Sequence, residues 1–177
     1  MLKHFAIISM IMIAHASAMN RPPVTTGADR LVSHHMKMLE GKRIGMVVNQ
    51  TSRLGSGEFI LDTLQKAGIT VTALFGPEHG IRGAEAAGEK VQDGVDAESG
   101  LPVFSLYGER NKPTPEMLRN VDLLVYDIQD VGARFYTYIS TLKLCMEAAA
   151  EHHIPFLVLD RPNPLGAMVD GPLLDDS

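Results

Sequence analysis

The pattern of apolar and polar positions predicts a chain in which strands alternate with helices. Five short, nearly continuous apolar runs are typical of strands that are covered on both faces. They span residues 43–50, 69–75, 101–106, 121–128 and 154–159. Because strands that are separated by helices usually pair in parallel, this order predicts an α/β fold. We expect a Rossmann-like open, mostly parallel sheet with helices on both faces.

Four segments around these strands have helical spacing. They span residues 28–39, 59–67, 114–118 and 135–152. The last segment is the longest, and its buried face is expected to carry Ile139, Leu142, Met146 and Ala149. Residues 84–100 are acidic and glycine-rich, and we expect a surface excursion there.

The N-terminus has the pattern of a secretory signal peptide. Lys3 and His4 precede an apolar run over residues 5–13, and Ala16-Ser17-Ala18 fits a cleavage site. The run is too short to span a bilayer. We therefore predict a signal peptide at residues 1–18, a secreted or periplasmic domain at residues 19–177, and no stable membrane span after cleavage. The alternative is an uncleaved anchor.

Charge and composition argue against a nucleic-acid partner, an internal disulfide and a bound metal. The net charge is -5 and the pI is near 5.8, which argues against a nucleic-acid partner because phosphate binding requires a basic face. The single cysteine, Cys145, has no partner for an internal disulfide and fits a buried helix position. His34 and His35 lack a third ligand at useful spacing, so no metal is expected.

Familiar cofactor and hydrolase motifs are missing from the sequence. Gly55-Ser56-Gly57 approaches the dinucleotide fingerprint, but Ile60 stands where the third glycine belongs. There is no phosphate-binding loop, no Gly-x-Ser-x-Gly elbow and no His-Glu-x-x-His sequence. We therefore expect no cofactor and turn to carboxylate chemistry.

Polar side chains follow every predicted strand. In open sheets of this kind, ligands bind outside the carboxyl ends of the strands. Those ends hold Asn49, Glu78, His79, Arg82, Tyr107, Asp127, Asp130, Arg134, Asp160, Arg161 and Asn163. Any one of them alone is more often a cap or a turn former, and N-capping of the following helix is the structural alternative for Asp127 and Asp130. Five strand ends with the same character favour a shared site.

The loop after the second strand carries the densest chemistry. Residues 75–83 combine three ionisable side chains with glycines and a proline, which fix unusual backbone angles and allow close approach to a ligand. A protonated carboxyl group at Glu78 that donates to a leaving oxygen would supply the general-acid half of glycoside hydrolysis. Asp127 and Asp130 are candidates for a second carboxylate, and Arg82, Arg134 and Arg161 suit an anionic substrate.

Four motifs in order resemble the exo-β-N-acetylmuramidase family of peptidoglycan recyclers. They are Gly45-x-Val47-x-Asn49-Gln50-Thr51 and the segments at residues 75–83, 126–138 and 159–164. The resemblance implies a Rossmann-like N-terminal domain packed against a smaller C-terminal domain. It also implies release of terminal N-acetylmuramic acid from the non-reducing ends of peptidoglycan fragments, with Glu78 as the catalytic residue. The lactyl carboxylate of that sugar would explain the arginines. Family members continue beyond the point at which this sequence stops, so their C-terminal domain is not in it.

From the strand ends and the resemblance we predict a site for a peptidoglycan-derived saccharide. Its catalytic groups are Glu78 and Asp127, although Asp127 is equally a candidate for orienting the substrate. Its substrate-binding residues are Asn49, His79, Arg82, Gln129, Asp130, Arg134, Asp160, Arg161 and Asn163. The missing C-terminal domain is expected to pack on this one. The main alternative is a non-catalytic domain that binds a cell-wall sugar, and a weaker one is a hydrolase for another anionic substrate such as a phosphate ester.

Overall fold

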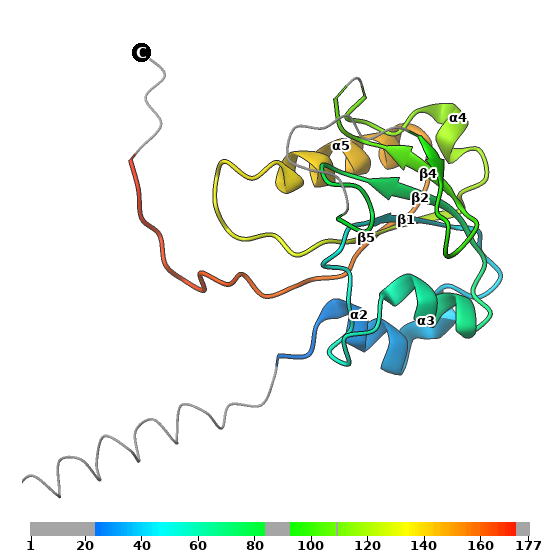
Figure 1. Ribbon diagram of the computed structural model, residues 1–177, viewed down its shortest axis with the longest axis horizontal. Coiled ribbons are helices and arrows are strands. Elements are labelled where there is room, and N and C mark those ends of the chain that lie inside the picture. Colours follow the sequence, from blue (N-terminus) through cyan, green and yellow to red (C-terminus); the bar gives the residue numbers. More distant parts are fainter. Residues whose placement is uncertain (1–23, 84–92, 109, 173–177) are drawn as a thin grey trace, which may run out of the picture.

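The protein is described by a computed structural model at residues 24–83, 93–108 and 110–172. Six strands form one sheet in the order β3-β4-β2-β1-β5-β6, as Figure 1 shows in part. Their bounds are β1 Ile44–Val48, β2 Val71–Gly76, β3 Gly94–Val95, β4 Pro102–Ser105, β5 Leu123–Asp127 and β6 Phe156–Val158. All neighbouring pairs are parallel except β3 and β4. The predicted α/β fold with a mostly parallel sheet is confirmed.

The helices lie on both faces of this sheet. They are α2 Gly27–Arg30, which continues as π-helical turns at Leu31–His35 and 3-10 turns at Met36–Met38, then α3 Ile60–Lys66, α4 Pro115–Leu118 and α5 Tyr138–Glu151. Figure 1 shows α2 and α3 below the sheet and α4 and α5 above it. No helix in the described part of the chain is long and apolar enough to cross a membrane.

Alternation along the strands divides the interior into two apolar cores. Met46 and Val125 face the core that includes α3, whereas Val47 and Leu124 face the core that includes α5. Side chains of successive strand residues point to opposite faces, so a strand covered on both sides is apolar at most of its positions. All residues of β1 and β5 are buried, which explains the continuous apolar runs.

The chain order creates a switch point beside β1. From β1 the chain moves outward on one side through β2 to β4, and it then returns to β5 and β6 on the other side. Strand order therefore reverses between β1 and β5, and crevices at such reversals are the usual ligand sites of open α/β sheets. Asn49 directly follows β1 at this position.

The expected surface excursion at residues 84–100 needs a correction, and the predicted signal peptide lies outside the described residues. The region expected to be a surface excursion contains β3, a two-residue antiparallel edge strand that pairs with Pro102 and Val103. Such a short strand is set by its neighbour rather than by an apolar run of its own. The predicted signal peptide at residues 1–18 lies outside the described residues, as do residues 84–92 of the excursion.

The expected buried face of α5 is wrong in part. Ile139 and Met146 are 60% and 49% exposed. Ala149 is buried as expected, and the other buried residues of the helix are Tyr138, Thr141, Cys145 and Ala148. Small side chains let the helix pack close to the sheet, and the larger apolar residues form a second face that points outward. The apolar residues of α5 are distributed around much of its circumference, so the spacing of apolar residues alone did not identify the face that packs on the sheet.

Candidate active site

The loop after β2 has a tightly constrained backbone around Glu78. The amide of Gly80 donates to the carbonyl oxygen of Pro77 at 3.0 Å, which closes a turn over residues 77–80. His79 has a φ of 72°, a left-handed conformation that is uncommon for residues other than glycine. A Cβ atom at Gly76 would lie 3.2 Å from the Ile81 side chain. The glycines that motivated the prediction therefore have a steric purpose, and the turn fixes the half-buried Glu78.

A pocket of about 180 Å³ lies against this loop. Its described lining comprises Glu78, His79, Phe135, Tyr136, Thr137 and Tyr138. The pocket thus joins the end of β2 to the segment that leads into α5. Of the described residues that line it, Glu78 alone carries a carboxyl group.

Tyr107 is a neighbour of Glu78 that our predicted site set omitted. Gly76 of β2 pairs with Ser105 of β4, so Glu78 and Tyr107 each lie two residues beyond a matched position. A hydrogen bond to Glu78 is the largest cause that raises the pKa of Tyr107. Tyr107 lay among the polar strand ends, and the parallel register of β2 and β4 was the information needed to pair it with Glu78.

Tyr138 is a second tyrosine near Glu78, and it lines the same pocket. Burial raises the pKa of its hydroxyl group, and the charge of Glu78 raises it further, whereas the nearby amides of Asn49 and Gln50 lower it. Its backbone carbonyl accepts a hydrogen bond from the Tyr126 hydroxyl at 3.0 Å. Two phenol groups, those of Tyr107 and Tyr138, therefore lie near the Glu78 carboxyl group.

Asn49 anchors a polar network at the switch point. Its side-chain oxygen accepts hydrogen bonds from the Thr51 amide at 2.9 Å and the Thr51 hydroxyl at 2.5 Å. The Thr51 oxygen in turn accepts from the Gln129 amide at 3.0 Å. Ser52 donates from its hydroxyl to the carbonyl oxygen of Asp127. The loops after β1 and β5 are thereby joined, and Asn49 and Gln129 lie at the same edge as predicted.

Asp127 is fully buried and forms an ion pair with Arg161. The Arg161 guanidinium donates from Nε to Oδ1 at 2.6 Å and from Nη2 to Oδ2 at 2.9 Å. Burial raises the pKa of Asp127, and the bonds from Arg161 oppose that shift. Arg161 Nη2 also donates to the carbonyl oxygen of Arg53 at 3.0 Å. Both carboxylate oxygens are engaged, and a catalytic role for Asp127 stays a prediction.

The loops after β5 and β6 contact each other through several predicted site residues. Gln129 Nε2 donates to the carbonyl oxygen of Pro162 at 2.9 Å. Gly132 has a φ of 75°, and a Cβ atom on it would lie 2.3 Å from the side-chain oxygen of Asn163, so another residue there would be strained and would displace the Asn163 side chain. Arg134 Nη2 donates to the carbonyl oxygen of Pro172 at 2.5 Å. These residues share one loop cluster.

The N-capping alternative for Asp127 and Asp130 is wrong. Helix α5 begins at Tyr138, and Thr137 occupies its N-cap position without a side-chain cap bond. Asp130 Oδ1 accepts instead from the Gly132 amide at 2.7 Å, which shapes the loop well before the helix. Asp160 is exposed, and its carbonyl oxygen accepts from the Gly27 amide at 2.7 Å.

The predicted arginines already have partners. Arg82 forms a bidentate pair with Asp96 at 2.8 and 2.9 Å and a further contact with Glu98 at 3.0 Å. Its guanidinium also lies 5.1 Å from the centre of the Phe59 ring. Together with the bonds of Arg134 and Arg161, this arrangement shows that the three guanidinium groups brace loops in the described structure. Their predicted contacts with substrate are not tested by it.

With this geometry in view, comparison with known proteins gives a clear family assignment. The family model described as "Exo-beta-N-acetylmuramidase NamZ, N-terminal" matches residues 44–177. The chain belongs to this family. It is 53% identical over 157 residues to the peptidoglycan beta-N-acetylmuramidase NamZ of Bacillus subtilis (strain 168), a match that covers 88% of this chain and 38% of that protein.

Solved structures of DUF1343 family proteins from Bacteroides fragilis NCTC 9343 resemble this NamZ family chain. One has a TM-score of 0.76 at 46% identity and is matched over 88% of this chain and 40% of its own. A second has a TM-score of 0.72 at 39% identity, with 87% and 39% covered. The chain therefore spans about two fifths of the length of these relatives.

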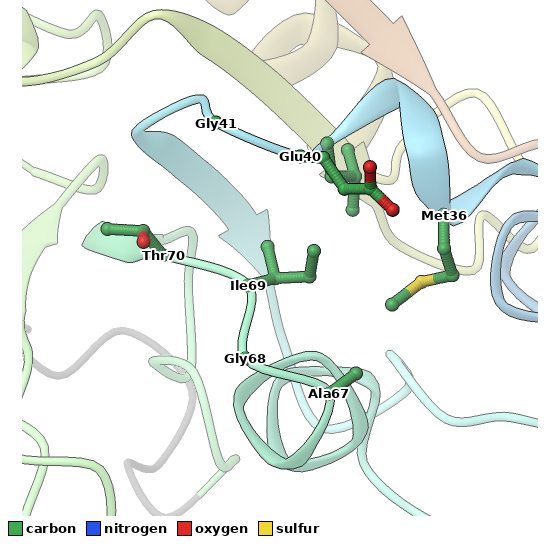
Figure 2. A pocket seen from close by; sticks show the side chains of 8 residues that line it. Met36, Glu40, Gly41, Ala67, Gly68, Ile69 and Thr70 are labelled. Atoms are coloured by element: carbon green, nitrogen blue, oxygen red, sulfur yellow. The ribbon is translucent and has the colours of Figure 1, made fainter.

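Other hollows of this NamZ family chain lie away from Glu78. A pocket of about 340 Å³ includes Met36, Glu40, Gly41 and Ile69, and Figure 2 shows the side chains of Met36, Glu40 and Ile69 turned toward it. Gly41 and Ile69 precede β1 and β2, which places this pocket at the amino ends of the strands. Within the described residues, no group of three or more His, Cys, Asp or Glu side chains is arranged to hold a metal ion.

Proposed function

We propose that this chain is the Glu78-bearing part of a glycoside hydrolase that releases terminal N-acetylmuramic acid from the non-reducing ends of peptidoglycan fragments. The observation that carries the proposal is the position of Glu78. It lines a pocket with aromatic residues at the carboxyl edge of the sheet, in a chain 53% identical to a peptidoglycan beta-N-acetylmuramidase. Family membership supports glycoside hydrolysis as the reaction class, and the position of Glu78 in the pocket supports this residue as the catalytic one.

Glu78 is proposed as the general acid. Its carboxyl group donates a proton to the glycosidic oxygen as the bond to the anomeric carbon breaks, and it then takes a proton from the attacking water. The Tyr107 hydroxyl holds the carboxyl group in one orientation during both steps. A positioned acid of this kind contributes about 100-fold to 10,000-fold to rate.

The second catalytic group is proposed to come from the substrate. Asp127 is 0% exposed and bound to Arg161 through both oxygens, so its contribution is better explained as positioning. The acetamido group next to the anomeric carbon of the sugar is a suitable internal nucleophile, as in glycosidases that use substrate assistance. This assignment predicts retention of configuration.

Export and a second domain belong to the same proposal. The signal-peptide pattern at residues 1–18 supports a secreted or periplasmic location, where peptidoglycan fragments occur. A further domain, as the greater length of the relatives suggests, would pack against this one. The exposed apolar side chains of Phe135, Ile139 and Met146 support such packing, because large exposed apolar patches commonly mark interfaces.

Release of free N-acetylmuramic acid from a purified muropeptide tests the proposal. The assay should compare this chain, a version extended with the remaining domain of the Bacillus subtilis relative, and the Glu78→Gln form of each. Release that depends on Glu78 supports hydrolysis. Tight muropeptide binding without any released sugar, in both the short and the extended proteins, would favour a non-catalytic cell-wall binding domain.

A further inference from the structure

Two buried side-chain atoms after β1 have no hydrogen-bond partner within the described residues. They are Nδ2 of Asn49 and Oε1 of Gln50. Leaving a buried polar group unpaired costs about 1–3 kcal/mol, so each such group requires an explanation. Asn49 is 0% exposed. Because its Oδ1 accepts two bonds from Thr51, its Nδ2 is the end left to donate.

Gln50 is held in place by the loop that carries Glu78. A Cβ atom at Gly83 would lie 3.0 Å from the Cβ, Cγ and Cδ atoms of Gln50. Gly83 has a φ of 71°, which disfavours any other residue. The Gln50 side chain therefore packs on a backbone position that only glycine fills, and its amide is fixed beside the loop.

Tyr138 is common to the pocket and to the surroundings of this amide pair. Its side chain lines the pocket with Glu78, and its hydroxyl group is near enough to Asn49 and Gln50 for both to lower its pKa against the larger effect of burial. The hydroxyl group does not complete a hydrogen bond of good geometry with Asn49 Nδ2 or Gln50 Oε1. A single hydroxyl group is thus a poor match for the two amides.

The unpaired atoms are one donor and one acceptor on adjacent residues. A secondary amide presents the complementary pair, a carbonyl oxygen and an N–H group. We infer that Asn49 and Gln50 form a subsite for the acetamido group of the sugar, which replaces the Tyr138 hydroxyl group when the Tyr138 ring turns aside. In this subsite Asn49 Nδ2 donates to the acetamido oxygen and Gln50 Oε1 accepts from its N–H. The inference rests on the proposed function.

The inferred subsite also favours the proposed chemistry. Tyr138 borders both the amide pair and Glu78, so an acetamido group bound in its place lies beside the carboxyl group. Hydrogen bonding at its N–H and oxygen fixes the orientation of the acetamido group, and orientation is a large part of the advantage of an intramolecular reaction.

Binding of two sugars by the 177-residue chain tests the inference. N-Acetylmuramic acid carries the acetamido group, and 3-O-lactylglucose has a hydroxyl group in its place. Calorimetric titration of the wild-type chain should show a preference for N-acetylmuramic acid of at least about tenfold, because sites built to hydrogen-bond a group discriminate against analogues that lack it.

Three variants sharpen this test. Asn49→Asp keeps the oxygen that Thr51 uses but replaces the donor with an acceptor, and it should abolish the preference. Gln50→Leu removes the acceptor without adding a charge and should reduce the preference independently if Asn49→Asp fails to fold. Thr63→Val is the matched control, because Thr63 Oγ1 is another buried atom without a hydrogen-bond partner in the described part of the chain but lies on α3. Thr63→Val should keep the full preference.

The outcomes separate this inference from the proposed function. A preference that persists in both amide variants, or that is missing from the wild-type chain, overturns the subsite even if muropeptides are hydrolysed. Loss of the preference in those variants alone supports the subsite, even if the chain releases no sugar and the proposed hydrolysis fails.

Discussion

Arg161 and Asp127 form a buried bidentate ion pair between residues 34 positions apart in the sequence. Asp127 ends β5, and Arg161 follows β6 at the same edge of the sheet. The pair fixes the loop after β6 against the strand that borders the switch point. The Asp127 side chain is 0% exposed and the Arg161 side chain is 7% exposed. If either partner is lost, water therefore cannot readily solvate the charge that remains.

Replacement of Arg161 by Leu should strongly destabilise the fold. The change leaves the Asp127 carboxylate buried without its partner, which typically costs about 3–5 kcal/mol. Urea denaturation followed by circular dichroism would measure the loss as a lower midpoint. Arg43→Leu is the control, because it breaks an exposed pair with Asp122 and should change the midpoint little. Equal effects of the two changes would contradict the structural role of the buried pair.

Glu78→Gln should abolish sugar release while leaving the fold intact. The amide is nearly isosteric but cannot act as a general acid, and a loss of about 100-fold or more is expected. Release of N-acetylmuramic acid and the thermal midpoint should be measured together. Glu58→Gln is the control, since Glu58 pairs with Lys66 on the α3 side. Wild-type turnover by Glu78→Gln would refute the assignment of the catalytic residue.

Tyr107→Phe should lower kcat for sugar release. A hydrogen bond to Glu78 raises the pKa of Tyr107, and we expect the same bond to hold the Glu78 carboxyl group in one orientation. Without the bond the carboxyl group is less well oriented toward the glycosidic oxygen, so kcat should fall by about tenfold to 100-fold while KM changes little. An unchanged kcat with a raised KM would contradict this orienting role.

Asp96 should make stability depend on pH in the acid range. Hydrogen bonds from Arg82, and then from Ser99, hold its pKa well below the ordinary value. A lowered folded-state pKa stabilises the fold fully above the unfolded-state pKa, near 3.8, and this contribution is lost as pH falls below it. Asp96→Asn should flatten the stability profile below about pH 4.

Glu98→Gln is the matched control for Asp96. Both acids contact Arg82, but the Glu98 side chain is 65% exposed and that of Asp96 is 5% exposed. Exposed ion pairs contribute little to stability, so Glu98→Gln should retain the acid dependence of the wild type. Stability curves that are identical for wild type and Asp96→Asn would show that the depressed pKa is not linked to folding.

The two faces of α5 should respond differently to a polar side chain. Met146→Gln changes an exposed position and should alter the free energy of unfolding by no more than about 0.5 kcal/mol. Ala148→Gln forces a larger polar group into the core and should cost about 1–3 kcal/mol. Chemical denaturation of both variants makes the comparison. If Met146→Gln lowered the free energy of unfolding more than Ala148→Gln does, the buried face of α5 would be the one expected from periodicity.

Much of the fold followed from local patterns in the sequence. Apolar runs located the five parallel strands because strands buried on both faces are apolar at most positions. The edge strand β3 was missed because its two residues, Gly94 and Val95, form no such run and depend on pairing with β4. The polar residues predicted to form the site lie at one edge of the sheet because the carboxyl ends of parallel strands converge there.

The sequence by itself determined the α/β order, the polar edge and the constrained loop around Glu78, because these depend on residue type and on spacing of a few positions. The tertiary structure alone decided which side chains meet. Strand register brought Tyr107 to Glu78, and chain crossing paired Arg161 with Asp127. Close packing also selected the small-residue face of α5. Each of these contacts joins residues whose separation along the chain carries no local signal, so only the packed sheet could reveal it.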